Sequence, residues 1–444
     1  MSRSALPPGP QLPAALQMVG FWTRPLAFLE QCRERYGKRF TIQLPFSPPF
    51  VMLSEPEQVK QVFQAAPDVL RPGEGARVLE PIIGSNSVIL LDGGAHMAQR
   101  KLMLPAFHGE RMERLAGLIE EVAEAEVAAL PKGTPVALHP RMQDLTLKVI
   151  LRAVFGLEPG PRFESLRQRL AQMLLFGDKP LSLVPPKPDS LLARAAERVG
   201  PFVRFVRMQE EVDEILFALI AERRVEHGGD DILAMLVEAR HEDGSPMSDQ
   251  EIRDELLTLL VAGHETTASS LAWAFSRLVH EPRVLGRLVE EIDAGEEAYV
   301  TATIQETMRA RPVLPNVAPR LVAQRIEVGG WSYEPGCSLV CNGYLIHHDP
   351  DVYPDPYSFR PERFLDDPPG TYTWIPFGGG RRRCLGASFA MLEMKIVLRA
   401  LLSTRELSAA GAAVEPAQRR NITVRPAGGA RVTLAERSRV AVPA

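Results

Sequence analysis

Apolar residues recur three or four positions apart over much of this chain, a spacing that lines one face of an α-helix. Four segments show the pattern clearly, at residues 55–64, 110–130, 142–155 and 203–225. Short β-branched and aromatic runs at 39–44 and 50–53 predict strands, and residues 421–434 return to strand-like alternation. The pattern predicts a mainly helical protein with a smaller β-rich region, near residues 38–54, 318–345 and 420–437.

The longest predicted helix runs from about residue 248 to residue 280. Ser248 and Glu251 can form a capping box, in which the hydroxyl and the carboxylate each satisfy a free backbone N–H of the first turn. Pro282 ends the helix because it lacks an N–H and disfavours helix in the residue before it. Residues 256–261 are almost all leucine or valine. We therefore expect a buried central helix.

Two segments rich in proline or glycine, residues 70–86 and 177–189, are predicted to be loops. Loops of this length in a compact chain are often functional. Neither an internal repeat nor a linker divides the sequence, so we expect residues 1–444 to form one domain.

Composition narrows the class of protein. The chain has 444 residues, 45% of them hydrophobic and 24% charged, with a formal net charge of −4. This balance does not favour nucleic acid or an anionic membrane as a partner. No run approaches the roughly 18 to 20 apolar residues of a transmembrane helix, and no apolar signal core follows the first residues. We expect a cytoplasmic monomer without a transmembrane anchor.

Only four cysteines occur, at Cys32, Cys337, Cys341 and Cys384. They form no Cys-x-x-Cys pair, which argues against zinc ribbons and thioredoxin-like redox sites. They are also too few for a disulfide framework in so long a chain. The first three are interpreted as small buried hydrophobic residues.

Cys384 differs because of its neighbours. Residues 374–386 read Trp-Ile-Pro-Phe-Gly-Gly-Gly-Arg-Arg-Arg-Cys-Leu-Gly, and a helix is predicted at 385–402. Glycines let the backbone turn tightly and approach a flat ligand. Free N–H groups at a helix start favour a thiolate, and adjacent arginines lower its pKa. Such a thiolate suits an iron ligand, whereas the alternative is a buried cysteine beside a solvated basic run.

The same segment contains Phe-x-x-Gly-x-Arg-x-Cys-x-Gly, formed by Phe377, Gly380, Arg382, Cys384 and Gly386. It resembles the haem-binding loop of the cytochromes P-450, the haem-thiolate monooxygenases. The resemblance, which extends over nearly the whole chain, implies that Cys384 is the axial ligand to the iron of haem b (iron protoporphyrin IX). Phe377 would cover the sulfur, and Gly386 would leave room beside the porphyrin. The implied fold has the long central helix over the haem and the cysteine loop on the opposite face.

Glu306 and Arg309 are three residues apart on a predicted helix, so their side chains can meet. Such pairs are usually solvated surface pairs. Here they resemble the family's Glu-x-x-Arg motif, and Arg363 in Pro-Glu-Arg-Phe resembles the arginine that joins it. The resemblance implies a structural role in folding and haem retention.

The central helix contains Ala-Gly-His-Glu-Thr-Thr at residues 262–267, which resembles the family's oxygen-activation motif. Small residues at Ala262 and Gly263 let a haem lie against the helix. The Thr266 hydroxyl can bond back to the carbonyl four residues earlier and bend the helix. Glu265 and Thr266 would then act as the catalytic proton relay. An ordinary helix kink is the alternative.

His96 and Arg100 lie one helical turn apart and resemble the His-x-x-x-Arg segment that holds the haem propionates. A solvated basic face is the alternative. Arg320 and Arg382 are further propionate candidates, by resemblance to bacterial family members.

A thiolate ligand favours cleavage of the O–O bond. The resemblance therefore implies that O2 is used to hydroxylate or epoxidise a small molecule. No Gly-x-Gly-x-x-Gly fingerprint for a nicotinamide or flavin occurs, so electrons are expected from a ferredoxin and a ferredoxin reductase. Residues 381–383 offer a basic docking patch for such a partner.

The segments implied to contact substrate are apolar, and they lie at residues 70–91, 177–189, 260–266 and 313–317. They suit a fatty acid, a terpene or a steroid, without a choice among these classes. Three alternatives remain open: a peroxide-using haem-thiolate peroxygenase, a non-catalytic haem gas sensor, and a structural helical protein without a cofactor. Glu265 and Thr266 count against the peroxygenase, which would not need them.

Overall fold

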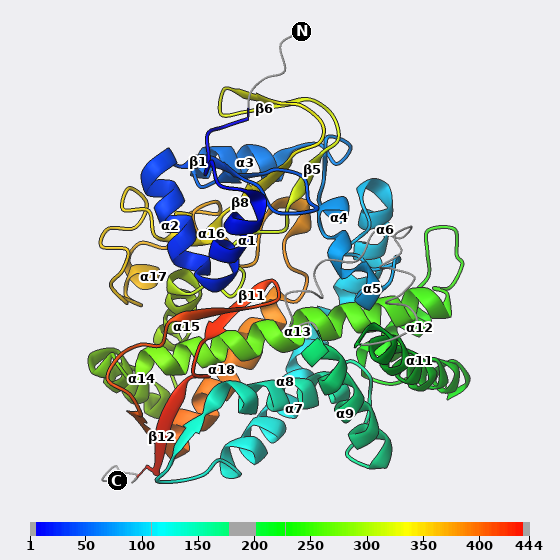
Figure 1. The fold of residues 1–444 in the computed structure, drawn as a ribbon. Helices are drawn as coiled ribbons and strands as arrows, with labels where there is room; N and C mark the ends of the chain where they lie inside the picture. The colour runs from blue at the N-terminus through cyan, green and yellow to red at the C-terminus, as the bar shows by residue number, and fades with distance from the viewer. Residues whose placement is uncertain (1–5, 108, 177–200, 227, 438–444) are drawn as a thin grey trace.

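The computed structural model describes residues 6–107, 109–176, 201–226 and 228–437. Helices dominate, and most strands lie at one end of the molecule together with the N-terminal helices (Figure 1). The longer helices are α1 (Ala14–Thr23), α2 (Pro25–Tyr36), α3 (Pro56–Gln64), α6 (Gly93–Met103), α7 (Glu110–Ala128), α8 (Leu138–Ala153), α9 (Pro161–Phe176), α11 (Pro201–Glu226), α13 (Asp249–Leu278), α14 (Pro282–Ala294), α15 (Ala298–Ala310) and α18 (Ala387–Thr404). The shorter helices are α4 (Pro72–Gly75), α5 (Glu80–Ile83), α12 (Ile232–Glu238), α16 (Gly343–His347) and α17 (Arg363–Asp366).

The largest sheet has five strands in the order β1-β2-β8-β5-β3, in which only β2 and β8 pair in parallel. Its strands are β1 (Arg39–Ile42), β2 (Phe50–Leu53), β3 (Leu70–Arg71), β5 (Arg320–Val322) and β8 (Ser338–Cys341). A second sheet joins β4 (Pro135–Ala137), β12 (Arg431–Glu436) and β9 (Arg405–Ala409). Two further two-stranded sheets are hairpins. One pairs β6 (Ile326–Val328) with β7 (Trp331–Tyr333), and the other pairs β10 (Ala417–Arg420) with β11 (Thr423–Pro426).

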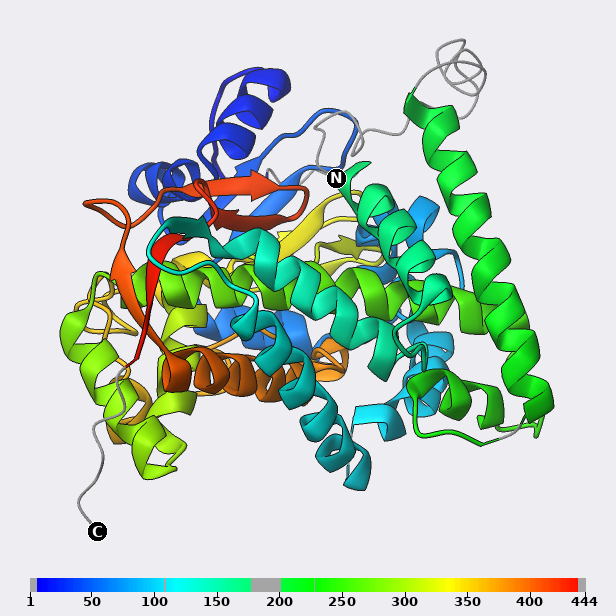
Figure 2. The ribbon, with the colours of Figure 1, turned by 90° about the horizontal axis from the view of Figure 1, so that it is seen from below.

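Helix α13 runs through the middle of the molecule and packs against α8, α11, α15, α18 and β11 (Figures 1 and 2). The predicted capping box is confirmed, because Ser248 accepts from the backbone N–H of Glu251 and the Glu251 carboxylate accepts from that of Ser248. Most side chains of the helix are buried, as its leucine-rich sequence predicts. In the second half of α13, the side-chain N–H of Trp273 donates a hydrogen bond to the carbonyl of Val424 in the β10–β11 hairpin.

The predicted mainly helical class and the β-rich regions are confirmed, with helix ends shifted by a few residues. The loop prediction for residues 70–86 is wrong, because this stretch forms β3, α4, a 3-10 turn (Arg77–Leu79) and α5. Each element is too short to show a periodic pattern. Strands β4 and β9 escaped prediction because each is formed by pairing with the distant β12. The predicted loop at 177–189 lies outside the described residues.

Across the ranges that the structure describes, no helix combines the length and the apolar character needed to cross a bilayer.

Candidate functional site

The loop before Cys384 is held in one conformation by close packing. Gly378 and Gly380 have φ angles of 67° and 64°, in the region that favours glycine. A Cβ on Gly379 would lie 2.3 Å from the Phe63 ring, so a larger residue cannot fit there. The backbone N–H of Cys384 donates to the carbonyl of Phe377 at 3.0 Å, which closes the loop.

Cys384 lies two residues before Gly386, the N-cap of α18, so the predicted helix begins slightly later than expected. The Cys384 side chain is accessible to solvent at one side, although many protein atoms lie near its sulfur. The expected lowering of its pKa is wrong for the free thiol: burial raises the pKa, and the Gly386 N–H, Arg100 and Arg383 offset only part of this effect. A bound metal ion deprotonates a coordinating thiol regardless.

Behind the loop, Glu306 and Arg309 form a fully buried ion pair, with Nε–Oε2 and Nη2–Oε1 distances of 2.6 and 2.9 Å. Arg363 joins them, with its Nε 3.2 Å from Oε2 of Glu306. Arg309 also donates to the carbonyls of His347 and Pro356, at 2.6 and 2.9 Å. The sequence prediction that these three residues come together is confirmed.

His347 connects this buried network to the cysteine loop. Its backbone carbonyl accepts from Arg309, and its Nε2 accepts from the N–H of Ile375 at 3.0 Å. Burial and Arg309 lower the pKa of His347 to about 3, so the ring is neutral and can accept. Through His347, the buried Arg309 therefore helps to hold the cysteine loop in place.

The four predicted propionate residues come from three parts of the chain, with His96 and Arg100 on α6, Arg320 on β5 and Arg382 in the cysteine loop. Burial lowers the pKa of Arg382 to about 10; Asp92 opposes this shift, and the positive charges of Arg320 and Arg100 add to it. Burial, Arg382 and Arg100 lower the pKa of His96 to about 4. His96 is therefore neutral at pH 7 and would contribute an N–H group rather than a charge.

The arginine run at 381–383 does not form the continuous basic patch that the sequence suggested. Arg381 and Arg383 are exposed, whereas Arg382 is half-buried and turned inward. The carbonyl of Arg383 accepts from Nη1 of Arg100 at 2.8 Å, which ties α6 to the loop. Arg320 is buried, donates to the carbonyl of Val62 at 2.8 Å and lies over the Phe63 ring.

Most side chains of α13 are buried, but several residues of the predicted oxygen-activation motif are accessible to solvent. Ala262 is exposed, and Val261, Gly263 and Thr266 are half-buried, although most of the helix on either side is sealed. Oγ1 of Thr266 donates to the carbonyl of Ala262 at 2.5 Å, as predicted. A hydroxyl that bonds in this way competes with the helical N–H for the same carbonyl.

Glu265 points toward α8 and the β10–β11 hairpin, where four side chains hold it. Oε1 lies 3.1 Å from His139 and 2.8 Å from Ser269, and Oε2 lies 2.7 Å from both Gln143 and Arg420. Burial favours the neutral acid, but hydrogen bonds and charge from His139, Arg420 and Ser269 lower the pKa of Glu265 to about 2. Glu265 is therefore a carboxylate at pH 7.

Sequence reasoning missed the partners of Glu265. His139 and Gln143 are one helical turn apart on α8, a spacing that could have marked a polar stripe. Arg420 lies on a strand 155 positions from Glu265, and no local sequence pattern predicts that the two residues meet.

Comparison with known proteins decides the family. Residues 6–434 match the family model described as Cytochrome P-450. The chain belongs to the cytochrome P-450 family. Putative cytochrome P-450 135B1 of Mycobacterium tuberculosis is 39% identical over 441 residues, which cover 97% of this chain and 92% of that protein. Putative cytochrome P-450 138 of the same organism is 38% identical over 435 residues, which cover 97% of each.

The fold agrees with this family. The solved structure described as retinoic acid bound cyanobacterial CYP120A1 matches with a TM-score of 0.83 at 24% identity, over 98% of this chain and all of that one. Cytochromes P-450 are haem-thiolate monooxygenases that use O2, electrons from redox partners and a small-molecule substrate. This chain is such an enzyme.

The residues of this cytochrome P-450 fit a haem. Cys384 is exposed in a glycine loop, and a Cβ on Gly386 would meet only the edge of Phe107, at 3.9 Å. Ala262 exposes a small side chain on an otherwise buried helix. The positive charges of Arg320 and Arg100 act on Arg382, and guanidinium groups are suited to binding carboxylates such as the haem propionates.

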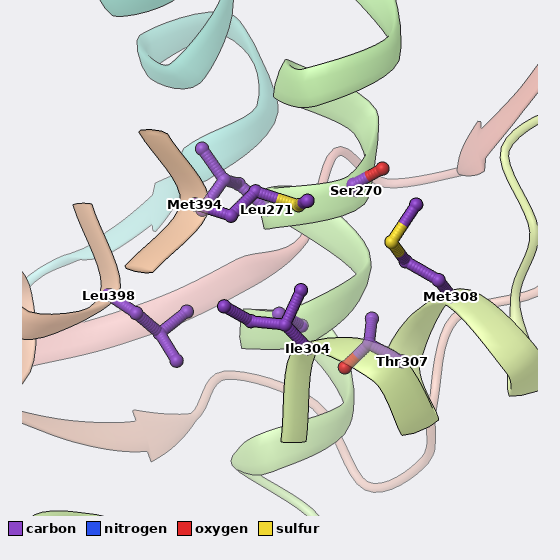
Figure 3. A pocket seen from close by; sticks show the side chains of 8 residues that line it. Ser270, Leu271, Ile304, Thr307, Met308, Met394 and Leu398 are labelled. Carbon is purple, nitrogen blue, oxygen red and sulfur yellow. The ribbon is translucent and has the colours of Figure 1, made fainter. Parts of the chain in front are cut away.

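The structure also contains a narrow hollow among α13, α15 and α18 (Figure 3). It is too narrow to admit a water molecule and contains none of the cysteine-loop residues. We interpret it as imperfect packing in the core of this cytochrome P-450. Its lining residues are Ser270, Leu271, Ala274, Ile304, Thr307, Met308, Met394 and Leu398.

Glu393 on α18 is buried beside Thr267, and burial raises its pKa to about 8 from an ordinary 4.5. Between pH 4.5 and pH 8, the folded protein therefore holds a proton on Glu393 that the unfolded chain has lost. The free energy of unfolding falls as the pH rises through this range. Glu393→Gln is expected to unfold like the wild type near pH 5. Between pH 5 and pH 8 the variant should become the more stable protein, by up to about 1.4 kcal/mol per pH unit, and the difference should stay constant above pH 8.

Urea unfolding at several pH values would measure this difference. Glu113→Gln, at an exposed position on α7, is the control and should follow the wild type at every pH. A constant difference between Glu393→Gln and the wild type from pH 5 to pH 9 would contradict the prediction.

Proposed function

We propose that this enzyme hydroxylates or epoxidises an apolar small molecule of the fatty acid, terpene or steroid class. Electrons would come from a ferredoxin and a ferredoxin reductase, and the chain would work as a single-domain cytoplasmic monomer. The observation that carries the proposal is the exposed Cys384 in its rigid glycine loop, supported from behind by Arg309 and His347.

In this proposal Cys384 binds the haem iron, and the thiolate-bound haem supplies the activation of O2. Phe377, Gly386 and Ala262 would contact the macrocycle. Its propionates would be bound by His96 as a neutral N–H donor and by three guanidinium groups. These are Arg100, Arg320 and Arg382. Glu306, Arg309 and Arg363 keep the loop in place and take no part in the chemistry.

Thr266 and Glu265 are proposed to handle protons. The Thr266 hydroxyl donates to the Ala262 carbonyl and can accept a hydrogen bond at the same oxygen. Glu265, held ionised by its partners, would pass a proton on rather than store one. His139, whose Nε2 lies 3.1 Å from both Glu265 and Ser269, would extend the hydrogen-bonded chain beyond Glu265.

An apolar substrate is supported by the side chains that join the 70–91 segment to α13. Leu79, Ile83 and Leu90 form a hydrophobic cluster against Val261, one residue before the oxygen-activation motif. These three side chains are buried, so the protein around this part of the motif is apolar, which would favour hydrocarbon over charged groups.

Thr266→Ala is expected to lower the product formed per electron consumed by about tenfold or more, while electron consumption continues. The reason is that oxygen would still be reduced without controlled proton delivery. The measurement compares electron-donor oxidation, peroxide release and product in the reconstituted system. Thr404→Ala removes the same type of back-bond, to the carbonyl of Ala400, at the end of α18 and is the matched control. Unchanged coupling in Thr266→Ala would exclude Thr266 from the relay.

An absorbance titration of the ferric protein with fatty acids, terpenes and steroids tests the proposed function. A Soret shift with one class, followed by oxygenated product in the presence of ferredoxin and its reductase, would support it. Oxygenated product formed with peroxide but not with the electron donors would indicate a peroxygenase. A gas sensor would bind CO or NO and turn over nothing.

A further inference from the structure

Asp92 has the position of a helix cap but does not act as one. It is the N-cap residue of α6, the helix that carries His96 and Arg100, and aspartate is among the residues preferred there. Its carboxylate nevertheless makes no capping bond to α6. The side chain turns instead toward two segments that are remote in sequence.

Three groups meet at this carboxylate. Nη2 of Arg382 lies 2.6 Å from Oδ1, and the backbone N–H groups of Gly73 and Glu74 donate to Oδ1 and Oδ2, at 2.9 and 3.2 Å. Asp92 and Arg382 are about one-fifth exposed, at 20% and 17%, so water screens the pair only in part. Asp92 therefore connects the start of α6, the 70–75 segment and the cysteine loop.

Arg382 is held by the same stretch of backbone. Nη1 donates to the carbonyls of Val88 and Ile89 at 3.2 and 3.3 Å, and Nη2 donates to that of Leu91 as well as to Asp92. A guanidinium has five N–H donors in a rigid planar fork. These four bonds fix its plane and leave at least one N–H for a further acceptor.

The backbone that holds Arg382 is itself fixed at both ends. At Val88, the N–H donates to Oε1 of the buried Glu255 on α13 at 2.8 Å. At the other end, a Cβ on Gly73 would lie 2.2 Å from the carbonyl oxygen of Leu90 and 2.8 Å from Oδ2 of Asp92. The Gly73 backbone therefore packs closely against Leu90 and Asp92, and no larger residue fits at position 73.

We infer that Asp92 is a positioning residue, which orients the Arg382 guanidinium so that its remaining N–H group faces a haem propionate. The inference rests on the proposed cofactor-binding role of Arg382. A flexible arginine would lose side-chain entropy on binding, whereas a guanidinium already held in place loses less. The negative charge of Asp92 also offsets the positive charges of Arg320 and Arg100 that act on Arg382.

Haem loss from the loaded enzyme to excess apomyoglobin tests the inference without any turnover. Asp92→Ala and Arg382→Gln are each expected to lose haem about tenfold faster than the wild type. The double variant should lose it no faster than Arg382→Gln, because Asp92 acts through Arg382. Asp213→Ala removes a comparable Asp–Arg pair, to Arg253, away from the loop and should match the wild type.

If Asp92→Ala folds poorly, Asp92→Asn preserves the size and one acceptor oxygen. Its haem reduction potential is expected to rise, because a negative charge beside the propionate-binding arginine is gone, and a purely structural role would leave the potential unchanged. Asp213→Asn is the control.

Fast haem loss from Arg382→Gln together with wild-type loss from Asp92→Ala would overturn the inference alone. Multiplying effects in the double variant, slower loss from Asp92→Ala or an unchanged potential in Asp92→Asn would do the same. Wild-type loss from Arg382→Gln would overturn the role of Arg382 as well.

Discussion

Cys384→Ala is expected to lose thiolate ligation of the haem completely, and with it all oxygenation activity. Alanine has no ligand atom, and the other cysteines are buried elsewhere, so none can replace the sulfur. The loop conformation should survive, because its contacts use the backbone: the N–H of residue 384 still donates to the carbonyl of Phe377. The variant therefore separates ligation from folding.

The ferrous-CO absorbance spectrum measures the result, since its Soret band depends on the ligand opposite CO. Cys384→Ser tests the same point with nearly the original volume. Cys32→Ala, at a buried cysteine on α2, is the control and should retain the wild-type spectrum. A wild-type ferrous-CO band in Cys384→Ala would show that another residue binds the iron.

Arg309→Leu is expected to destabilise the protein by about 3–5 kcal/mol, a large share of the about 5–15 kcal/mol that stabilises a typical fold. The substitution leaves the Glu306 carboxylate buried with only Arg363 to offset it, and it leaves the carbonyls of His347 and Pro356 without their donor. The cysteine loop loses support through His347. We therefore expect weak haem retention even in the folded fraction.

Urea unfolding and the haem content of purified protein measure these two effects. Arg283→Leu is the matched control, because it removes an exposed arginine from its pair with Glu362 and should cost no more than about 1 kcal/mol. Replacing Glu306 and Arg309 together by apolar residues should recover part of the loss, since no charge is left uncompensated. Equal stability of Arg309→Leu and Arg283→Leu would contradict a supporting role for the buried network.

Features that depend on residues a few positions apart were predictable from the sequence. The capping box of Ser248 and Glu251 closes within one turn, and Glu306 meets Arg309 at a spacing of three. The back-bond from Thr266 to Ala262 follows from helix geometry alone. Such interactions need only the local conformation, which hydrophobic periodicity predicts well in long helices.

The chemistry of Cys384 was also readable, because the glycines, arginines and cysteine of its loop are contiguous in the chain. The pKa of its thiol was not. The prediction assumed that the neighbouring arginines surround the sulfur, but Arg382 turns away toward Asp92, 290 positions distant. Burial then outweighs the remaining positive charges.

By itself the sequence determined the helical class and the central helix, and it indicated the residues that we propose for the haem-thiolate chemistry. Only the tertiary structure decided how those residues are held: Glu265 among His139, Gln143, Ser269 and Arg420, and Arg382 by Asp92. The physical reason is that ionisation and side-chain direction depend on desolvation and on partners brought together by folding. Those partners come from distant elements and leave no periodic trace in the chain.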